Sequence, residues 1–178
     1  MKPETFFRRF ASYYRRRYNS SGSEIWLSDP DREDSAGWLA VMGVLLSRGA
    51  RATGFRQHWE DSEGKESKID FVWREVRRGP AAVLIEHESG YVSKNNPRWL
   101  KLLRADSEEN PVRVLITYAR PHGKARLSQQ KYIEKKLRKY KRASSRFLLI
   151  VGTYYVRGAT PWEGYSWDRQ SRALRRVD

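Results

Sequence analysis

Apolar side chains recur along this chain with two different periods, and each period predicts a different kind of element. Aromatic residues three and four positions apart, with arginines between them, predict an amphipathic helix over residues 3–18. A second helix is expected over 36–48, where nearly every face is apolar, as in a helix buried in a core. Ser35 is its expected N-cap and Gly49 its expected C-terminal stop.

Three strands are predicted next. Residues 53–59 carry the weakest signal, residues 68–76 are rich in β-forming side chains, and residues 81–87 form an almost continuous apolar run. Such a run is typical of a strand that is buried on both faces. The short connections between the three segments favour an antiparallel meander.

The second half of the chain alternates between helical and strand patterns. Helices are expected over 94–105 and 128–142, the latter with Ser128 as N-cap, and strands over 112–118 and 147–156. A strand–helix–strand–helix–strand order implies right-handed crossovers and a partly parallel sheet.

The predicted organisation is a single α/β domain, a mixed sheet flanked by helices. It occupies residues 35–156, after a basic aromatic helix over 1–18 and a loop over 19–34. The tail over 157–178 contains aromatic residues but no clear period, so its structure stays undetermined at this level.

The charge of the chain indicates a polyanionic partner. Its 178 residues include 36 Lys+Arg and 21 Asp+Glu, a net charge of +15. Residues 111–147 hold twelve of the basic residues and one acid, and residues 1–20 hold six and one. Nucleic acid is favoured over membrane as the partner, the alternative being a protein that charge merely keeps in solution.

Composition excludes several classes of chemistry. The chain has no Cys, so disulfides, thiolate zinc sites and Cys nucleophiles are excluded. The longest apolar stretch, residues 38–46, is too short for a helix that spans a bilayer. No secretory signal is apparent at residue 1, so a soluble intracellular protein is expected, with no membrane partner.

The segment 128–142 is a candidate surface for binding nucleic acid. Between its few apolar positions, nearly all residues are Lys or Arg. Such a surface would contact phosphates and so bind many sequences almost equally, although it could also be only the solvated side of a helix. The predicted contact residues are Lys131, Lys135, Lys136, Arg138, Lys139 and Arg142.

Two carboxylates interrupt apolar strands and are the strongest candidates for chemistry. Asp70 lies within the strand predicted over 68–76, and Glu86 ends the strand over 81–87. Strand periodicity places Glu86 and Glu88 on one face and His87 on the other, where a packed rather than catalytic His is expected. Asp70 joins the two glutamates if its strand pairs in a suitable register. Clustered carboxylates suit Mg²⁺ or Mn²⁺.

An ordinary structural role for these acids is equally compatible with their spacing. Burying a carboxylate in an apolar strand is costly unless it is paired, hydrogen-bonded or bound to metal. The guanidinium groups of Arg74, Arg77 and Arg78 are near enough in sequence to serve as partners.

The order of these features resembles the PD-(D/E)XK nuclease superfamily. The resemblance consists of Asp70, a tight turn, Glu86-x-Glu88 on the next strand, and then a helix and a strand, and it covers about residues 35–118. It implies a restriction-endonuclease-like αβββαβ core and Mg²⁺-dependent cleavage of nucleic acid. Asp70 and Glu86 would then be metal ligands, joined by Glu88 or by the backbone carbonyl of His87.

The chain departs from the superfamily pattern at two positions. Ile69 stands where the pattern has Pro, and Glu88 stands where it has Lys. Members of the superfamily sometimes move this Lys to another element. Lys94, at the start of the next predicted helix, is the first substitute, and Lys68 is the second.

The leading hypothesis is therefore a metal-dependent nuclease, with Asp70, Glu86, Glu88 and Lys94 as its site and DNA favoured over RNA. The alternative is a non-catalytic nucleic-acid-binding protein that keeps the nuclease-like fold, which Glu88 in place of Lys favours. A third hypothesis is a basic RNA-binding protein of another α/β fold, in which Asp70 and Glu86 would lie far apart. A homodimer is compatible with all three.

Overall fold

The computed structural model describes residues 2–21, 52–60, 66–74, 80–88, 92–95, 97–105, 110–119, 123–153 and 162–177. The helix predicted over 36–48 and most of the predicted loop over 19–34 lie outside these residues. The strands are β1 (Ala52–Glu60), β2 (Glu66–Arg74), β3 (Ala81–His87), β4 (Val112–Ala119), β5 (Phe147–Thr153), β6 (Trp162–Asp168) and β7 (Ala173–Val177). The helices are α1 (Pro3–Ser21), the 3₁₀ turn η2 (Arg98–Leu100), α3 (Lys101–Arg104), α4 (Gly123–Leu137) and α5 (Lys141–Ser144).

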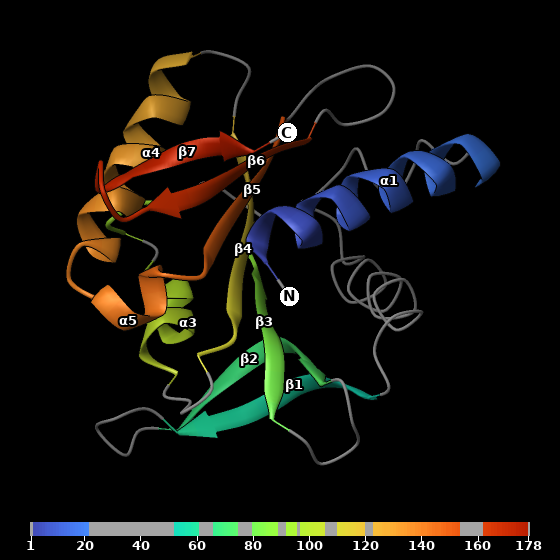
Figure 1. Cartoon of the computed structure of the whole chain (residues 1–178), viewed down its shortest axis with the longest axis horizontal. Coiled ribbons are helices and arrows are strands. Elements are labelled where there is room, and N and C mark those ends of the chain that lie inside the picture. Colours follow the sequence, from blue (N-terminus) through green and yellow to red (C-terminus); the bar gives the residue numbers. More distant parts are fainter. Residues whose placement is uncertain are drawn as a thin grey trace.

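The described strands form one mixed sheet of seven, in the same order in space as in sequence. β1, β2 and β3 are antiparallel neighbours, β3, β4 and β5 run parallel, and β6 and β7 complete the sheet as antiparallel strands. The antiparallel meander and the partly parallel second half are therefore confirmed, and the fold is α/β with helices on both faces of the sheet (Figure 1).

Each face of the sheet has its own apolar core. On one face, Leu84, Leu115 and Leu149 pack with apolar residues of α3 and α4. On the other, strand residues such as Ile85 and Ile150 pack against the aromatic side chains of α1. Alternate residues of the central strands thus enter opposite cores, which explains why these strands are apolar almost throughout. Figure 1 shows α1 on one side of the sheet and α3, α4 and α5 on the other.

The N-terminal helix is held through its aromatic residues. Phe6, Phe7 and Phe10 are buried, and the rings of Phe10 and Trp162 meet edge to face with centroids 5.1 Å apart. Arg8 and Arg9 are exposed. The prediction of an amphipathic helix is confirmed, and α1 continues to Ser21, beyond the predicted end.

The helix predicted over 94–105 is much shorter in the structure. Residues 92–95 are irregular, the 3₁₀ turn η2 follows Pro97, and only Lys101–Arg104 are α-helical. Proline disfavours the helical conformation of the residue before it, so a helix that included position 96 would be strained. The apolar positions were identified correctly, since Trp99, Leu102 and Leu103 are buried, but the α-helix that carries the leucines is only one turn long.

The basic helix is displaced from its predicted bounds. α4 begins at Gly123 and ends at Leu137, so Ser128 lies inside the helix and is not its N-cap. Tyr140, with φ −111° and ψ 64°, separates it from α5. The first turn of α4 lacks large apolar residues, which is why the hydrophobic period did not reveal it.

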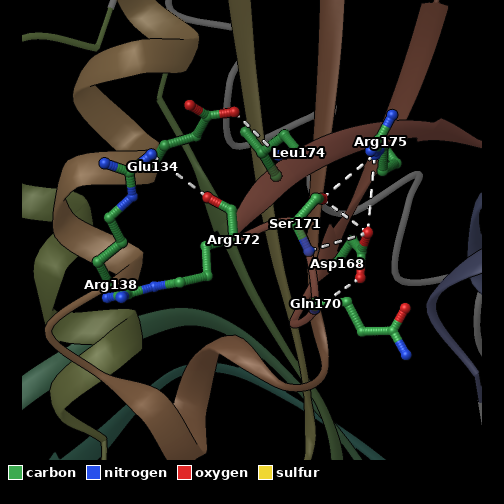
Figure 2. A network of polar contacts seen from close by, with 8 residues as sticks. All are labelled: Glu134, Arg138, Asp168, Gln170, Ser171, Arg172, Leu174 and Arg175. Atoms are coloured by element: carbon green, nitrogen blue, oxygen red, sulfur yellow. Dashed lines mark hydrogen bonds and ion pairs between the residues drawn. The ribbon is translucent and has the colours of Figure 1, made fainter.

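The C-terminal tail forms the hairpin β6–β7, which sequence left undetermined. Its turn over 169–172 is held by side chains, as Figure 2 shows. The Asp168 carboxylate accepts hydrogen bonds from the Gln170 amide (2.9 Å) and the Ser171 hydroxyl (2.6 Å). The Glu134 carboxylate of α4 accepts one from the Leu174 amide (2.9 Å). The hairpin is therefore fixed against α4.

Arg113 is a buried cation that ties α3 to β4. It is 3% exposed, and its guanidinium donates to the carbonyl oxygens of Leu102 (3.1 Å), Ala105 (3.0 Å) and Pro111 (3.1 Å). It also donates to Oδ1 of Asn110 at 2.8 Å. Carbonyls at the end of a helix have no partner within the helix, and here Arg113 supplies one.

Arg113→Met is expected to lower the free energy of unfolding by about 3 kcal/mol. Methionine occupies similar volume but donates no hydrogen bonds, so several buried carbonyls lose their partner. Urea denaturation followed by circular dichroism measures the change. The exposed Arg9→Met is the control and is expected to change stability by less than about 0.5 kcal/mol. An R113M protein as stable as R9M would show that these hydrogen bonds contribute nothing.

Candidate active site

Asp70 and Glu86 face each other across the β2–β3 pair and exchange hydrogen bonds. The backbone N–H of Asp70 donates to Oε1 of Glu86 at 2.8 Å. The backbone N–H of His87 donates to Oδ2 of Asp70 at 3.0 Å. Each carboxylate is thus held by the opposite strand, which is the close approach that the sequence required for a shared site.

The exchange occurs where the two strands separate. The register of β2 with β3 runs from Arg74 opposite Ala81 to Phe71 opposite Ile85, and the two acids stand one step beyond. There β3 continues beside β4, with Glu86 opposite Leu115. The carboxylates replace the backbone partners that neighbouring strands would otherwise supply, and this satisfies the amides of both strands.

Lys101 completes the cluster. Its ammonium nitrogen lies 2.9 Å from Oε2 of Glu86 and 4.0 Å from Oδ1 of Asp70. Its neighbours Leu102 and Leu103 are buried in the core, so the first turn of α3 is fixed relative to the sheet. The Glu86 side chain is only 2% exposed, whereas those of Asp70 and Lys101 are 22% and 24% exposed and can be reached from solvent.

The environment of Glu86 makes its ionisation unfavourable. Burial, and then the nearby negative charge of Asp70, raise the pKa of the Glu86 carboxyl to about 8. The Lys101 ammonium acts in the opposite direction but does not compensate for burial. A carboxyl with this pKa changes protonation near neutral pH, and a second cation beside it would favour the ionised form.

The two carboxylates suit a divalent cation. One oxygen of each is engaged by a backbone amide, and the other, Oε2 of Glu86 or Oδ1 of Asp70, faces the same positive charge of Lys101. Strand residues direct their N–H and C=O groups to the same side, so the His87 carbonyl also faces β2 and is a candidate third oxygen. Oxygen donors of this kind are the ligands of Mg²⁺ and Mn²⁺.

The lysine beside the acids is not the one that sequence favoured. Lys94 is exposed in the turn over 93–95 and makes no ion pair with Asp70 or Glu86, whereas Lys101, seven residues later, contacts both. The side chain of Lys68, the second substitute, is outside the described set, as are those of Arg74, Arg77 and Arg78. Sequence offered only one signal for Lys101, a lysine flanked by core leucines in the helix after the motif.

Glu88 is buried but does not gather with the other two acids into a metal-binding group. Its backbone N–H donates to the carbonyl of Ile116 at 2.9 Å, which keeps β3 paired with β4. Among the side chains that the structure describes, no group of three or more His, Asp or Glu could hold a metal. The predicted role of Glu88 as a ligand stays a prediction.

His87 lies on the opposite face from Glu86, as periodicity predicted. Its Nε2 is 3.2 Å from the Tyr118 hydroxyl, and burial lowers the pKa of its imidazole to about 4. Tyr118 in turn packs against Trp162 under α1, with ring centroids 5.5 Å apart. His87 is therefore part of the packing on the α1 side of the sheet.

The basic residues predicted to bind nucleic acid are mostly exposed. Lys131, Lys135, Arg138, Lys139 and Arg142 are exposed, and the Lys136 ammonium lies 5.5 Å from the centre of the Tyr132 ring. The opposite side of α4 is buried through Ile133 and Leu137. The basic side of α4 and of the residues that follow it therefore faces solvent, on the same face of the sheet as α3 and Lys101.

Comparison with family models, curated proteins and solved structures finds no match to this chain. Within the helices described, none is both long enough and apolar enough to cross a membrane.

Proposed function

We propose that this protein is a metal-dependent nuclease of the PD-(D/E)XK type that hydrolyses phosphodiester bonds, with DNA favoured over RNA as substrate. The observation that carries the proposal is the cluster of Asp70, Glu86 and Lys101 where β2 and β3 separate. Two carboxylates and a lysine are the side chains that the superfamily pattern requires. Here the lysine comes from α3 instead of β3.

The topology supports the same proposal. Three antiparallel strands are followed by α3 and by β4, which runs parallel to β3, and this order is compatible with the βββαβ part of the implied core. The acids lie on the second and third strands of this unit. The helix that would precede the strands falls outside the described residues.

The proposed chemistry divides among the three side chains. Asp70 and Glu86 would hold Mg²⁺ or Mn²⁺, which when bound supplies activation of water and stabilisation of charge on the phosphate. Lys101, partly exposed beside them, can donate a hydrogen bond to a phosphate oxygen and add positive charge where negative charge develops. Because burial gives Glu86 a high pKa, a proton competes with the cation for this carboxylate below about pH 8.

The distribution of charge supports nucleic acid as the substrate. α3, with Lys101, and the basic α4 cover the same face of the sheet. A negatively charged strand attracted to that face would meet the acidic cluster from the side on which Lys101 lies. The acidic cluster and the basic side of α4, which the sequence linked only by composition, are thus compatible with one binding surface.

A non-catalytic nucleic-acid-binding protein is the second candidate. The specific observation in its favour is that Lys101 already lies beside both acids, so the cluster has a counter-ion without metal. That candidate predicts binding in every metal condition and cleavage in none.

Cleavage assays in Mg²⁺, Mn²⁺ and EDTA separate the two candidates. Wild type is expected to cut single-stranded or duplex DNA, or RNA, only with metal, and Asp70→Asn to lower the rate by at least about a hundredfold. The substituted asparagine keeps the size of the side chain and can still accept from the His87 amide, so D70N should fold normally. Cleavage in EDTA, or an undiminished D70N rate, would contradict the proposed site, and binding without cleavage would favour the second candidate.

A further inference from the structure

A groove between α4–α5 and the β6–β7 hairpin gathers five basic side chains around one aromatic ring. Its volume is about 580 Å³, and its lining includes Arg138, Lys141, Arg142, Arg169, Arg172 and Trp167. We call it the arginine groove. No carboxylate is among the described residues that line it.

The two acids closest in sequence to this lining are turned to structural partners. Glu134 accepts from the Leu174 amide, and Asp168 accepts from the Gln170 amide and the Ser171 hydroxyl (Figure 2). The Glu134 bond holds the hairpin against α4. The Asp168 bonds fix the turn that carries Arg169 and Arg172, so these two side chains of the groove come from a fixed scaffold.

Arg172 stands where the backbone favours glycine. Its φ is +52°, in the left-handed region, which costs a residue with a β-carbon about 1 kcal/mol. A glycine would adopt this conformation without that cost. The turn keeps an arginine there instead, and its carbonyl accepts from the Arg138 guanidinium at 3.4 Å. Glycine, which this backbone favours, would supply no cation to the groove, whereas Arg172 lines it.

The arginine groove leads towards the candidate active site. A smaller pocket of about 270 Å³ shares Lys141 and Arg142 with it and reaches Arg104 at the end of α3. Arg104 is three residues from Lys101, so both lie on the same side of this single helical turn. Basic side chains therefore line the two pockets from the hairpin to Arg104, within one helical turn of the lysine beside Asp70 and Glu86.

We infer that the arginine groove binds a single-stranded segment of nucleic acid, with phosphates on the basic side chains and a base against Trp167. The Trp167 ring, partly buried against the core, favours a single strand, since bases inside a duplex are already stacked on both faces. A duplex would meet the same cations but would place no internal base on this ring. The inference deepens the proposed nuclease function, on which it rests, by naming the form of the substrate strand.

Binding measured in EDTA tests the inference without cleavage. Fluorescence anisotropy with a labelled oligonucleotide of about 12 nucleotides, within the usual site size for a single strand, gives the affinities. The probes are single-stranded DNA, the same sequence in RNA, and the corresponding DNA duplex. Wild type is expected to bind a single strand, of either chemistry, at least about fivefold more tightly than the duplex. A duplex bound equally well or better would overturn the inference.

Charge-matched variants locate the site. R169Q/R172G is expected to weaken single-strand binding about tenfold at about 0.15 M salt and to reduce the slope of log affinity against log salt by about 1.4, for two lost phosphate contacts. K2Q/R9Q removes the same charge from α1 and the residue before it, on the opposite face, and a loss under about threefold is expected. Equal losses in the two variants would show that only net charge matters.

Two further variants distinguish stacking and folding from charge. Trp167→Leu should weaken single-strand binding about tenfold with an unchanged salt slope, because stacking releases no counterions. An unchanged affinity would overturn the stacking role. Arg172→Gly alone should retain the melting temperature, as it relieves the strained φ, and yet bind less tightly. Binding in EDTA requires no cleavage, so failure of the nuclease proposal remains distinguishable from failure of this one.

Discussion

Lys101→Met is expected to reduce the rate of phosphodiester cleavage by about a thousandfold while leaving the protein folded. The methionine retains the length of the side chain but removes the ammonium that lies 2.9 Å from Glu86 and 4.0 Å from Asp70. A preorganised positive charge beside a reacting phosphate is typically worth two to three orders of magnitude in rate. The removal also raises the pKa of Glu86 further, since Lys101 is the charge that lowers it.

Lys94→Met is the matched control for this prediction. Lys94 is exposed and contacts neither acid, so its removal should change the rate less than about threefold. Initial rates at saturating metal, with melting temperatures of both variants, make the comparison. If K94M lost activity and K101M kept it, the catalytic lysine would be the one that sequence favoured, and the ion pair of Lys101 would have only a structural role.

The strands were predictable because burial on both faces leaves a simple signal. The bounds of β3 agree with the predicted segment, and β4 exceeds its prediction by one residue, Ala119, since most residues of each strand are apolar. β6 and β7 were missed because their residues are only partly buried. Arg175 and Arg176 are exposed, so the hairpin shows neither an apolar run nor a clear alternation.

The two acids were predictable for a physical reason, and the lysine was not. A carboxylate in an apolar strand requires a partner, so the sequence alone marks Asp70 and Glu86 as unusual. Their register was left open by the sequence, and in the structure it includes a shift between Trp73 and Arg74. Lys101 has no such signal, because lysines are common on helix surfaces and its position depends on where Pro97 permits α3 to begin.

Glu86→Gln is expected to abolish cleavage and at the same time to stabilise the protein at pH 8. In wild type the pKa of Glu86 is raised from 4.5 to about 8, chiefly by burial. Between these pH values the unfolded chain has released this proton and the native state retains it. The contribution of Glu86 to the free energy of unfolding is therefore fully present below about pH 4.5 and declines as pH rises to about 8.

The size of the stabilisation follows from the shift. One pKa unit corresponds to about 1.4 kcal/mol, so E86Q should exceed wild type by up to about 4 kcal/mol at about pH 8 and differ little near about pH 4.5. Urea denaturation in EDTA at both pH values measures the difference. A gain of the same size at both would indicate a packing effect of the amide, and no gain at the higher pH would show that Glu86 ionises without penalty.

A divalent cation should stabilise wild type but not E86Q, because the carboxylate whose ionisation destabilises the native state is also a proposed metal ligand. A divalent cation binds the ionised carboxylates of the native state, so Mn²⁺ should raise the melting temperature of wild type most at about pH 8, where the proton competes least. E86Q lacks one of the two carboxylates and should show little shift. An equal shift in both proteins would place the cation elsewhere. A shift confined to wild type would mean that the instability of ionised Glu86 is relieved by the cation it is proposed to hold.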